Sequence, residues 1–386
     1  MKVTELTVPF LKGMNKVELR SLIQRYLRRQ GFRIRSGRVY PPDNLDKPKL
    51  RELHASAVEH KLEHSGNALA RLEPRLIQHI ASGSEMIPEK ISPRLVEVEP
   101  NSEEELLFRY ASLHWSIPVS SGYGRRLRFL VVDDQNQKLM GIFGLGDPVF
   151  SLSARDEWIG WTAATRKERL YHVMDAFALG AVPPYSFLLC GKLVAMLAAS
   201  NEVRNAFKRK YVGHVSRIQE RPLDARLALI TTTSALGRSS IYNRIKYGER
   251  LLYEGVGFTR GFGEFQFSNG LYKPILDYAD RWCTPTDRKK GWGTGFRNRR
   301  EVVRKCLIKL GLSSAWRIHG VQREVYVVPL ARNTREFLRG NHSRLQWHDH
   351  SVENLFQFFR ERWLLPRSER DRRYKEFDRS HYIIWN

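Results

Sequence analysis

The spacing of apolar residues changes at about residue 127, and this change constrains the fold more than any other feature of the sequence. Before it, apolar residues recur at the spacing of helices. After it, short runs of β-branched, aromatic and aliphatic residues predict a series of strands. The expected elements are strands at 127–132, 138–144 and 226–231, a strand or short helix at 170–178, a pair of strands within 251–267, and helices at 187–210 and 239–247. This order predicts an α+β core with a mixed sheet.

Two further regions flank this core. Residues 1–100 read as helical, and Asn15 with Glu18 has the spacing of a capping box. The stretch 86–100 contains three prolines and reads as a linker. We therefore expect a helical N-terminal region at 1–100, the α+β core at 101–280 and a basic C-terminal region at 281–386.

The charge of the chain is strongly positive and unevenly distributed. It has 65 Lys and Arg against 41 Asp and Glu, a net +24, and residues 281–386 alone contribute 24 basic and 11 acidic residues, or +13. Such an excess favours a polyanionic partner, with nucleic acid first among them. The basic C-terminal region also ends in an arginine-rich tail after a predicted strand at 324–328.

Composition excludes several classes of protein. Aromatic residues make up 11% of the chain, which argues against intrinsic disorder. No run approaches the roughly 20 apolar residues of a membrane-spanning helix. The three cysteines are far apart and lack the spacing of metal ligands, so we expect a reducing, cytoplasmic location.

The segment 229–244 combines a buried-type strand, a hydroxyl-rich loop and a predicted helix start. Backbone N–H groups at such a start bind anions, so we expect an anion or cofactor site there. Its residues are Gly237, Arg238, Ser239 and Ser240. Tyr242 and Asn243 line the same opening and, with Asp175, are the candidate catalytic residues. The alternative is that Ser239 or Ser240 simply caps the helix.

A loop near residue 290 interleaves cations with aromatic residues, a pattern typical of phosphate contact combined with base stacking. We expect it to bind nucleic acid. The predicted contacts are Arg288, Lys289, Lys290, Trp292, Phe296, Arg297, Arg299, Arg300 and Arg304. The alternative is a solvated basic face.

Metal-binding patterns are weak in this sequence, and we expect no metal site. The pattern His60 to His64 matches a zinc-peptidase spacing, but His60 lies off the apolar stripe of its helix. His348, Asp349 and His350 lie in an arginine-rich stretch that favours an exposed surface. The pair Asp133–Asp134 has the position of turn residues that bond their own backbone.

Several longer blocks resemble one known family. They are Tyr171–Tyr185, Gly191–Ala195, Thr232–Arg244, Gly257–Gly263 and Gly291–Arg304. Together they resemble the DruA family of the bacterial Druantia anti-phage defence system. This resemblance implies a role in a multi-gene system whose other subunits include a large helicase.

The element order also resembles that of acyl-CoA-dependent N-acyltransferases (GNAT-like proteins), including a divergent branch that modifies DNA. That resemblance implies that the helix following residue 187 begins beside a cofactor pyrophosphate. The chain departs from the pattern at this point, because Pro184–Phe187 stand where a glycine-rich loop is expected. The sequence therefore assigns no cofactor.

Three hypotheses about function follow. The first is a component of bacterial phage defence that binds nucleic acid, with DNA as the favoured partner. The second is an enzyme that modifies or cleaves nucleic acid through the GNAT-like core, as an acyltransferase-like enzyme or a nuclease. The third is a scaffold subunit whose basic surface docks on acidic partners.

Overall fold

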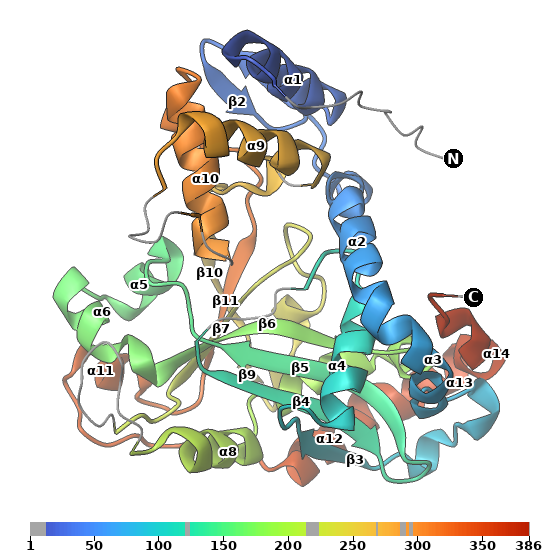
Figure 1. Ribbon diagram of the computed structural model, residues 1–386. Helices are drawn as coiled ribbons and strands as arrows, with labels where there is room; N and C mark the ends of the chain where they lie inside the picture. Colours follow the sequence, from blue (N-terminus) through green and yellow to red (C-terminus); the bar gives the residue numbers. More distant parts are fainter. Residues whose placement is uncertain are drawn as a thin grey trace. The chain divides into compact units, whose positions relative to one another are not determined.

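The computed structural model describes residues 13–119, 124–213, 224–267, 269–285, 291–292 and 296–385 (Figure 1). By its contacts the chain divides into two compact units, each made of two separate segments. Unit 1 comprises residues 1–60 and 260–322, and unit 2 comprises residues 61–259 and 323–386. Unit 1 therefore joins the start of the N-terminal region to the start of the basic C-terminal region.

The described part of unit 1 includes the helices α1 (Lys16–Arg29), α9 (Tyr272–Trp282) and α10 (Phe296–Lys309) and a hairpin of β1 (Arg33–Arg35) and β2 (Arg38–Tyr40). The predicted capping box is confirmed. The Asn15 side chain accepts hydrogen bonds from two backbone N–H groups, and the Glu18 carboxylate accepts one from the Asn15 N–H at 2.8 Å. Helix α2 (Lys47–Leu69) begins in unit 1 and ends in unit 2.

The core of unit 1 forms where the apolar stripe of α1 meets α9 and α10. Leu19, Ile23 and Leu27 of α1 are buried with Ile275 of α9 and Val302 of α10. Their spacing of three to four residues places them on one helical face. The opposite face of α1 is left to polar residues, and arginine predominates there.

Unit 2 is built on a seven-stranded sheet with the order β10-β11-β7-β6-β5-β4-β3. Its strands are β3 (Pro93–Glu97), β4 (Arg126–Asp133), β5 (Lys138–Gly146), β6 (Val173–Ala181), β7 (Leu229–Thr233), β10 (Glu254–Phe258) and β11 (Glu324–Pro329). Every neighbouring pair is antiparallel except β6 and β7, which are parallel over only three residue pairs. The predicted α+β class with a mixed sheet is confirmed.

Helices cover both faces of this sheet. Helix α4 (Glu103–Leu113) contacts β4 and β5 on one face, where Ile142 is buried (Figure 1). Helices α7 (Cys190–Leu197) and α12 (Val352–Phe359) pack on the other face, where Phe143 is buried. Strand β5 is consequently buried along almost its whole length.

Shorter helices and a second hairpin complete unit 2. They are α3 (Glu73–Leu76), α5 (Ser153–Ile159), α6 (Ala163–Arg169), α8 (Asn201–Tyr211), α11 (Thr334–Arg339), α13 (Leu365–Arg370), α14 (Arg373–Glu376) and the strands β8 (Lys246–Tyr247) and β9 (Arg250–Leu251). Within the described ranges, no helix is long and apolar enough to cross a membrane.

Three sequence predictions need correction. The helix predicted at 187–210 is broken into α7 and α8, because the Ser200 hydroxyl accepts the Val203 N–H and starts a new helix. The stretch 86–100 is more than a linker, since it contains edge strand β3. The helix predicted at 239–247 is only the single turn Tyr242–Arg244, followed at once by β8.

Candidate functional site

The parallel pair β6–β7 carries a buried polar contact at the point where its pairing ends. Asp175 lies opposite Thr231 in the last recorded pair, and the Thr231 hydroxyl donates to its carboxylate at 2.7 Å. Burial raises the pKa of Asp175 to about 6, although Thr231 and the Arg155 guanidinium both act to lower it. A carboxyl group with such a pKa is suited to proton transfer near neutral pH.

Tyr242 lies close to the same strands, in the single helical turn after β7. Its ring stacks on Tyr253 at 5.0 Å between centroids and meets Tyr326 edge-on at 5.2 Å. Burial raises the pKa of Tyr242 to about 12; a hydrogen bond with Thr232 lowers it, and the charge of Asp175 raises it. The structure thus brings two of the predicted catalytic residues, Asp175 and Tyr242, within electrostatic range of each other.

Asn243 follows Tyr242 in this turn. Its side-chain oxygen is buried, and it has no hydrogen-bond partner among the described residues. The catalytic roles of Asp175, Tyr242 and Asn243 remain predictions.

The loop Gly237–Ser240 does not precede the α-helix expected from the sequence. The Ser239 hydroxyl accepts the backbone N–H groups of Ile241 and Tyr242, each at 3.1 Å. The Ser239 N–H itself donates to the Tyr326 hydroxyl at 3.3 Å, and Arg238 lies 3.6 Å from the Glu324 carboxylate. The N–H groups of Ser239, Ile241 and Tyr242 are therefore occupied within the protein, and the anion site at Gly237–Ser240 stays a prediction.

The basic C-terminal residues are partly outside the described ranges. Arg288, Lys289 and Lys290 lie outside them, as do the side chains of Phe296 and Arg297. Arg299 stacks over Tyr272 at 4.0 Å, Arg300 pairs with Glu264 at 3.4 Å, and Arg304 pairs with Glu301 at 2.7 Å. The described cations of this group thus have partners within unit 1.

The position of Trp292 does not match the base-stacking role expected for it. Its side chain is only 8% exposed and packs in the core of unit 1, with the Lys305 ammonium 5.6 Å from its ring centroid. A base needs an exposed ring face on which to stack. Trp292 is accordingly a core residue in this structure.

The weaker metal patterns have structural explanations where the structure describes them. Asp133 accepts the Gln135 N–H at 3.1 Å, as expected for a turn, and also the Tyr185 hydroxyl at 2.8 Å. Asp349 accepts from the Asn201 side chain at 2.6 Å. The described residues contain no cluster of three or more His, Cys, Asp or Glu suited to a metal ion.

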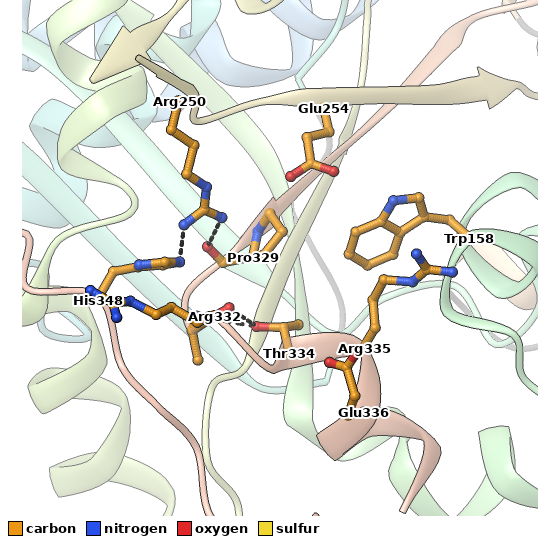
Figure 2. Close-up of a pocket in the computed structure, with 10 residues that line it drawn as sticks. Trp158, Arg250, Glu254, Pro329, Arg332, Thr334, Arg335, Glu336 and His348 are labelled. Carbon is orange, nitrogen blue, oxygen red and sulfur yellow. Dashed lines mark hydrogen bonds between the residues drawn. The ribbon is translucent and has the colours of Figure 1, made fainter. Parts of the chain in front are cut away.

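Two features were missed at the sequence level. The first is a cavity of about 480 Å³ in unit 2 (Figure 2). Its walls come from α5, β9, β10, the end of β11, α11 and the segment before α12. Because these elements are far apart in the sequence, no local sequence pattern predicts the cavity. The lining residues are Trp158, Arg250, Glu254, Pro329, Ala331, Arg332, Thr334, Arg335, Glu336 and His348.

The second missed feature is a basic surface on unit 1, which we call the α1–hairpin surface. It consists of the exposed residues Arg20, Arg25, Arg28, Arg29, Arg33, Arg35 and Arg38. The sequence did contain a signal for it, because residues 19–42 include these seven arginines and no acidic residue.

Comparison with known proteins places the chain in a family. The family model described as "Druantia protein DruA" matches residues 44–340. A curated relative, the Druantia protein DruA of Escherichia coli (strain UMEA 4076-1), is 37% identical over 365 residues, which cover 94% of this chain and 90% of the relative. No solved structure matches. On the length of the family match and the identity to this relative, the chain belongs to the DruA family.

Proposed function

We propose that the chain is a DNA-binding component of a bacterial Druantia-type defence system, working with other subunits that include a helicase. Membership in the DruA family supports the defence role. A single observation carries the DNA-binding role: the α1–hairpin surface concentrates seven arginines without one acidic residue in residues 19–42. Unit 1 as a whole has 26 basic and 11 acidic residues, a net +15 in 123 residues.

The fold directs these arginines away from the core of unit 1. On α1 the core positions are Leu19, Ile23 and Leu27, so the arginines between them occupy the solvent-facing side. On the hairpin, Val39 is buried and Ile34 is half-buried, while the neighbouring arginines are exposed. Alternation along a strand places those arginines together on one face.

Protein carboxylates neutralise little of this charge. Arg33 pairs with Asp43 at 2.7 Å. For the other six arginines, no side-chain ion pair or hydrogen bond is recorded with any described residue. A surface of this kind favours an external polyanion, whose binding releases condensed counterions.

The tip of the hairpin strengthens this argument. Arg35 and Arg38 lie directly opposite each other in the strand register. They flank a two-residue turn in which Ser36 has φ 45° and Gly37 has φ 70°, the positive values that a type I′ turn requires. Like charges placed directly opposite in a hairpin are destabilising. A DNA phosphate between them would offset that repulsion, and the nearby Tyr40 ring is 40% exposed.

The test is a salt titration of binding to a duplex DNA of random sequence, followed by fluorescence anisotropy. We expect the logarithm of the affinity to fall linearly with the logarithm of the salt concentration. In the double variant Arg35→Ala/Arg38→Ala the slope should decrease by about two, because two phosphate contacts are lost. A matched control, Arg372→Ala/Lys375→Ala, removes the same charge from exposed positions of unit 2 and should leave the slope unchanged.

The outcomes separate two failures. A flat salt dependence in the unaltered protein overturns DNA binding as the function. Equal losses in the hairpin double variant and its control overturn the α1–hairpin surface as the binding site.

We propose acyltransferase-like modification of nucleic acid as a second candidate function. The observation that favours it is the arrangement of strands in the sheet. Strand β6 is followed along the chain by α7 and pairs in parallel with β7. Asp175 lies in the last residue pair of these two strands. This agrees with the element order that the acyltransferase resemblance implies. Tyr185, however, lies where that resemblance expects a glycine-rich loop, and its hydroxyl donates to buried Asp133.

The second candidate is tested by mass spectrometry of nucleosides from DNA incubated with the protein, with and without acyl-CoA or a divalent metal. A modified nucleoside that disappears in Asp175→Asn supports it. Unmodified, uncleaved DNA under every condition excludes it.

A further inference from the structure

The cavity of unit 2 has two chemically different walls. Figure 2 shows Arg250, His348 and Arg332 on one side and Trp158 with Arg335 on the other. Glu254 points into the space from strand β10. Thr334 contributes little to recognition, because its hydroxyl is used within the fold, donating to the Ala331 carbonyl at 2.9 Å.

The first wall is cationic, and no ion pair is recorded for it among the described residues, although the charge of Glu254 acts on Arg250. The Arg250 guanidinium donates to the His348 ring and, at 3.4 Å, to the Pro329 carbonyl. Burial, followed by the charges of nearby arginines and His350, lowers the pKa of His348 to about 4. His348 is therefore neutral at pH 7 and accepts from Arg250, which orients the guanidinium while leaving its charge intact.

Arg332 completes this wall. Its side chain is exposed, and the structure records no hydrogen bond or ion pair for it within the described residues. Two guanidinium groups with no carboxylate in direct contact form a favourable site for a phosphate, which guanidinium groups bind through paired hydrogen bonds.

The second wall is aromatic. The Arg335 guanidinium carbon lies 5.2 Å from the centroid of the Trp158 ring. Indole rings and guanidinium planes both stack against nucleobases. Glu254, on a third side, can accept hydrogen bonds from base amino groups or sugar hydroxyls. The volume of about 480 Å³ lies within the range of small-ligand pockets.

We propose that this cavity binds a single nucleotide, with its phosphate at Arg250 and Arg332 and its base beside Trp158 and Arg335. The nucleotide is either a free mononucleotide or the phosphorylated end of a DNA strand, since both present the same chemistry. The site lies wholly in unit 2 and requires no contact with the α1–hairpin surface of unit 1. It adds to the proposed DNA-binding function and does not depend on it.

The test is isothermal titration calorimetry of the full chain with four probes: inorganic phosphate, deoxyadenosine, deoxyadenosine monophosphate, and a short oligonucleotide with or without a 5′ phosphate. We expect the monophosphate to bind more tightly than either phosphate or the nucleoside. Arg332→Ala should weaken its affinity about tenfold, the loss of one charged hydrogen-bonding group. Trp158→Ala should weaken the binding of the monophosphate but not the binding of inorganic phosphate.

Arg372→Ala is the control, because it removes an exposed arginine of unit 2 that does not line the cavity. Tighter binding of the 5′-phosphorylated oligonucleotide than of its unphosphorylated form, with the difference lost in Arg332→Ala, identifies a strand end as the ligand; equal binding of the two forms beside binding of the monophosphate identifies a free nucleotide. Absence of monophosphate binding, together with equal binding of the two forms of the oligonucleotide, overturns the proposal, as does monophosphate binding that is unchanged in Arg332→Ala. Either result leaves the salt-dependent duplex binding of unit 1 to be judged separately.

Discussion

The two units use arginine in different ways. Unit 2 has 39 basic and 30 acidic residues, a net +9 in 263 residues, against +15 in the 123 residues of unit 1. Many arginines of unit 2 are tied to carboxylates in its interior or at its edges. Such pairs join Arg125 to Asp147, Arg128 to Glu105, Arg155 and Arg166 to Asp156, and Arg367 and Arg373 to Asp371.

Most arginines of the α1–hairpin surface have no such partner in the described structure. This difference between paired and unpaired arginines shows that a count of basic residues does not locate a ligand-binding surface. Charge that is already neutralised by the fold stabilises structure, whereas charge left unneutralised is available to a partner. The predictions below test this contrast.

The largest effect is expected for Arg155, the fully buried arginine of unit 2. Its guanidinium donates twice to Asp156, at 2.7 and 2.8 Å, and also to the Val149 carbonyl at 3.0 Å. Arg155→Ala leaves a buried carboxylate with one partner fewer, so we expect the free energy of unfolding to fall by about 3–5 kcal/mol. Urea unfolding measures this change.

The matched comparison is Arg35→Ala on the hairpin of unit 1. Because that side chain is exposed, its removal should change the free energy of unfolding by less than about 0.5 kcal/mol. Similar losses in the two variants would break the contrast between structural and available arginines.

An intermediate effect on the free energy of unfolding is expected for Asp175, and this effect depends on pH. Its pKa is raised in the fold from 3.8 to about 6, so folding favours the protonated carboxyl group. The stability due to this group is complete below pH 3.8 and is lost as the pH rises through about 6. Asp175→Asn cannot ionise, so at pH 7.5 it should be more stable than the unaltered protein by up to about 3 kcal/mol.

Urea unfolding of both proteins between pH 4 and 8 (roughly the span of this titration) checks the prediction. The difference between them should grow with pH and then level off. A constant difference across this range would show that Asp175 has no raised pKa. A residue that is retained for function at a cost in stability is also expected to give a more stable protein when it is replaced.

The sequence predicted those parts of the fold that depend on local signals. The capping box at Asn15 and the two strands that form the β4–β5 hairpin were both predicted, because their determinants lie within a few residues of each other. The helix expected at 239–247 was not formed, because the Tyr242 ring packs against Tyr253 and Tyr326 instead. Tyr253 lies beyond the end of the predicted helix, and Tyr326 is distant from it in the sequence.

The candidate sites show the same division between features set by local sequence and features set by long-range packing. Asp175 and Tyr242 were selected from separate motifs, and the fold brings them into electrostatic range. Trp292 looked like a stacking residue because its neighbours are basic, yet its burial depends on packing within unit 1. The cavity of unit 2 joins Trp158, Arg250 and Arg332 across long stretches of sequence. A site assembled in this way is visible only once the fold is known.

The smallest expected effect concerns the opposed pair Arg35 and Arg38, and it distinguishes a functional surface most directly. Arg38→Glu replaces a like-charge pair by an opposite-charge pair at directly facing positions. We therefore expect the free energy of unfolding to rise by about 0.2–1 kcal/mol. The same change should weaken binding to duplex DNA, because it removes one cation from the α1–hairpin surface and adds an anion.

Denaturant unfolding and the salt titration, performed on the same preparation, measure the two effects together. A variant that is more stable and binds less tightly indicates that the arginine pair is maintained at a cost in stability for the sake of a polyanionic ligand. A variant that is less stable indicates instead that Arg38 is held by an acidic group of the protein. In that case Arg38 would serve the fold as the paired arginines of unit 2 do, and the contrast between them and the α1–hairpin surface would fail at its strongest point.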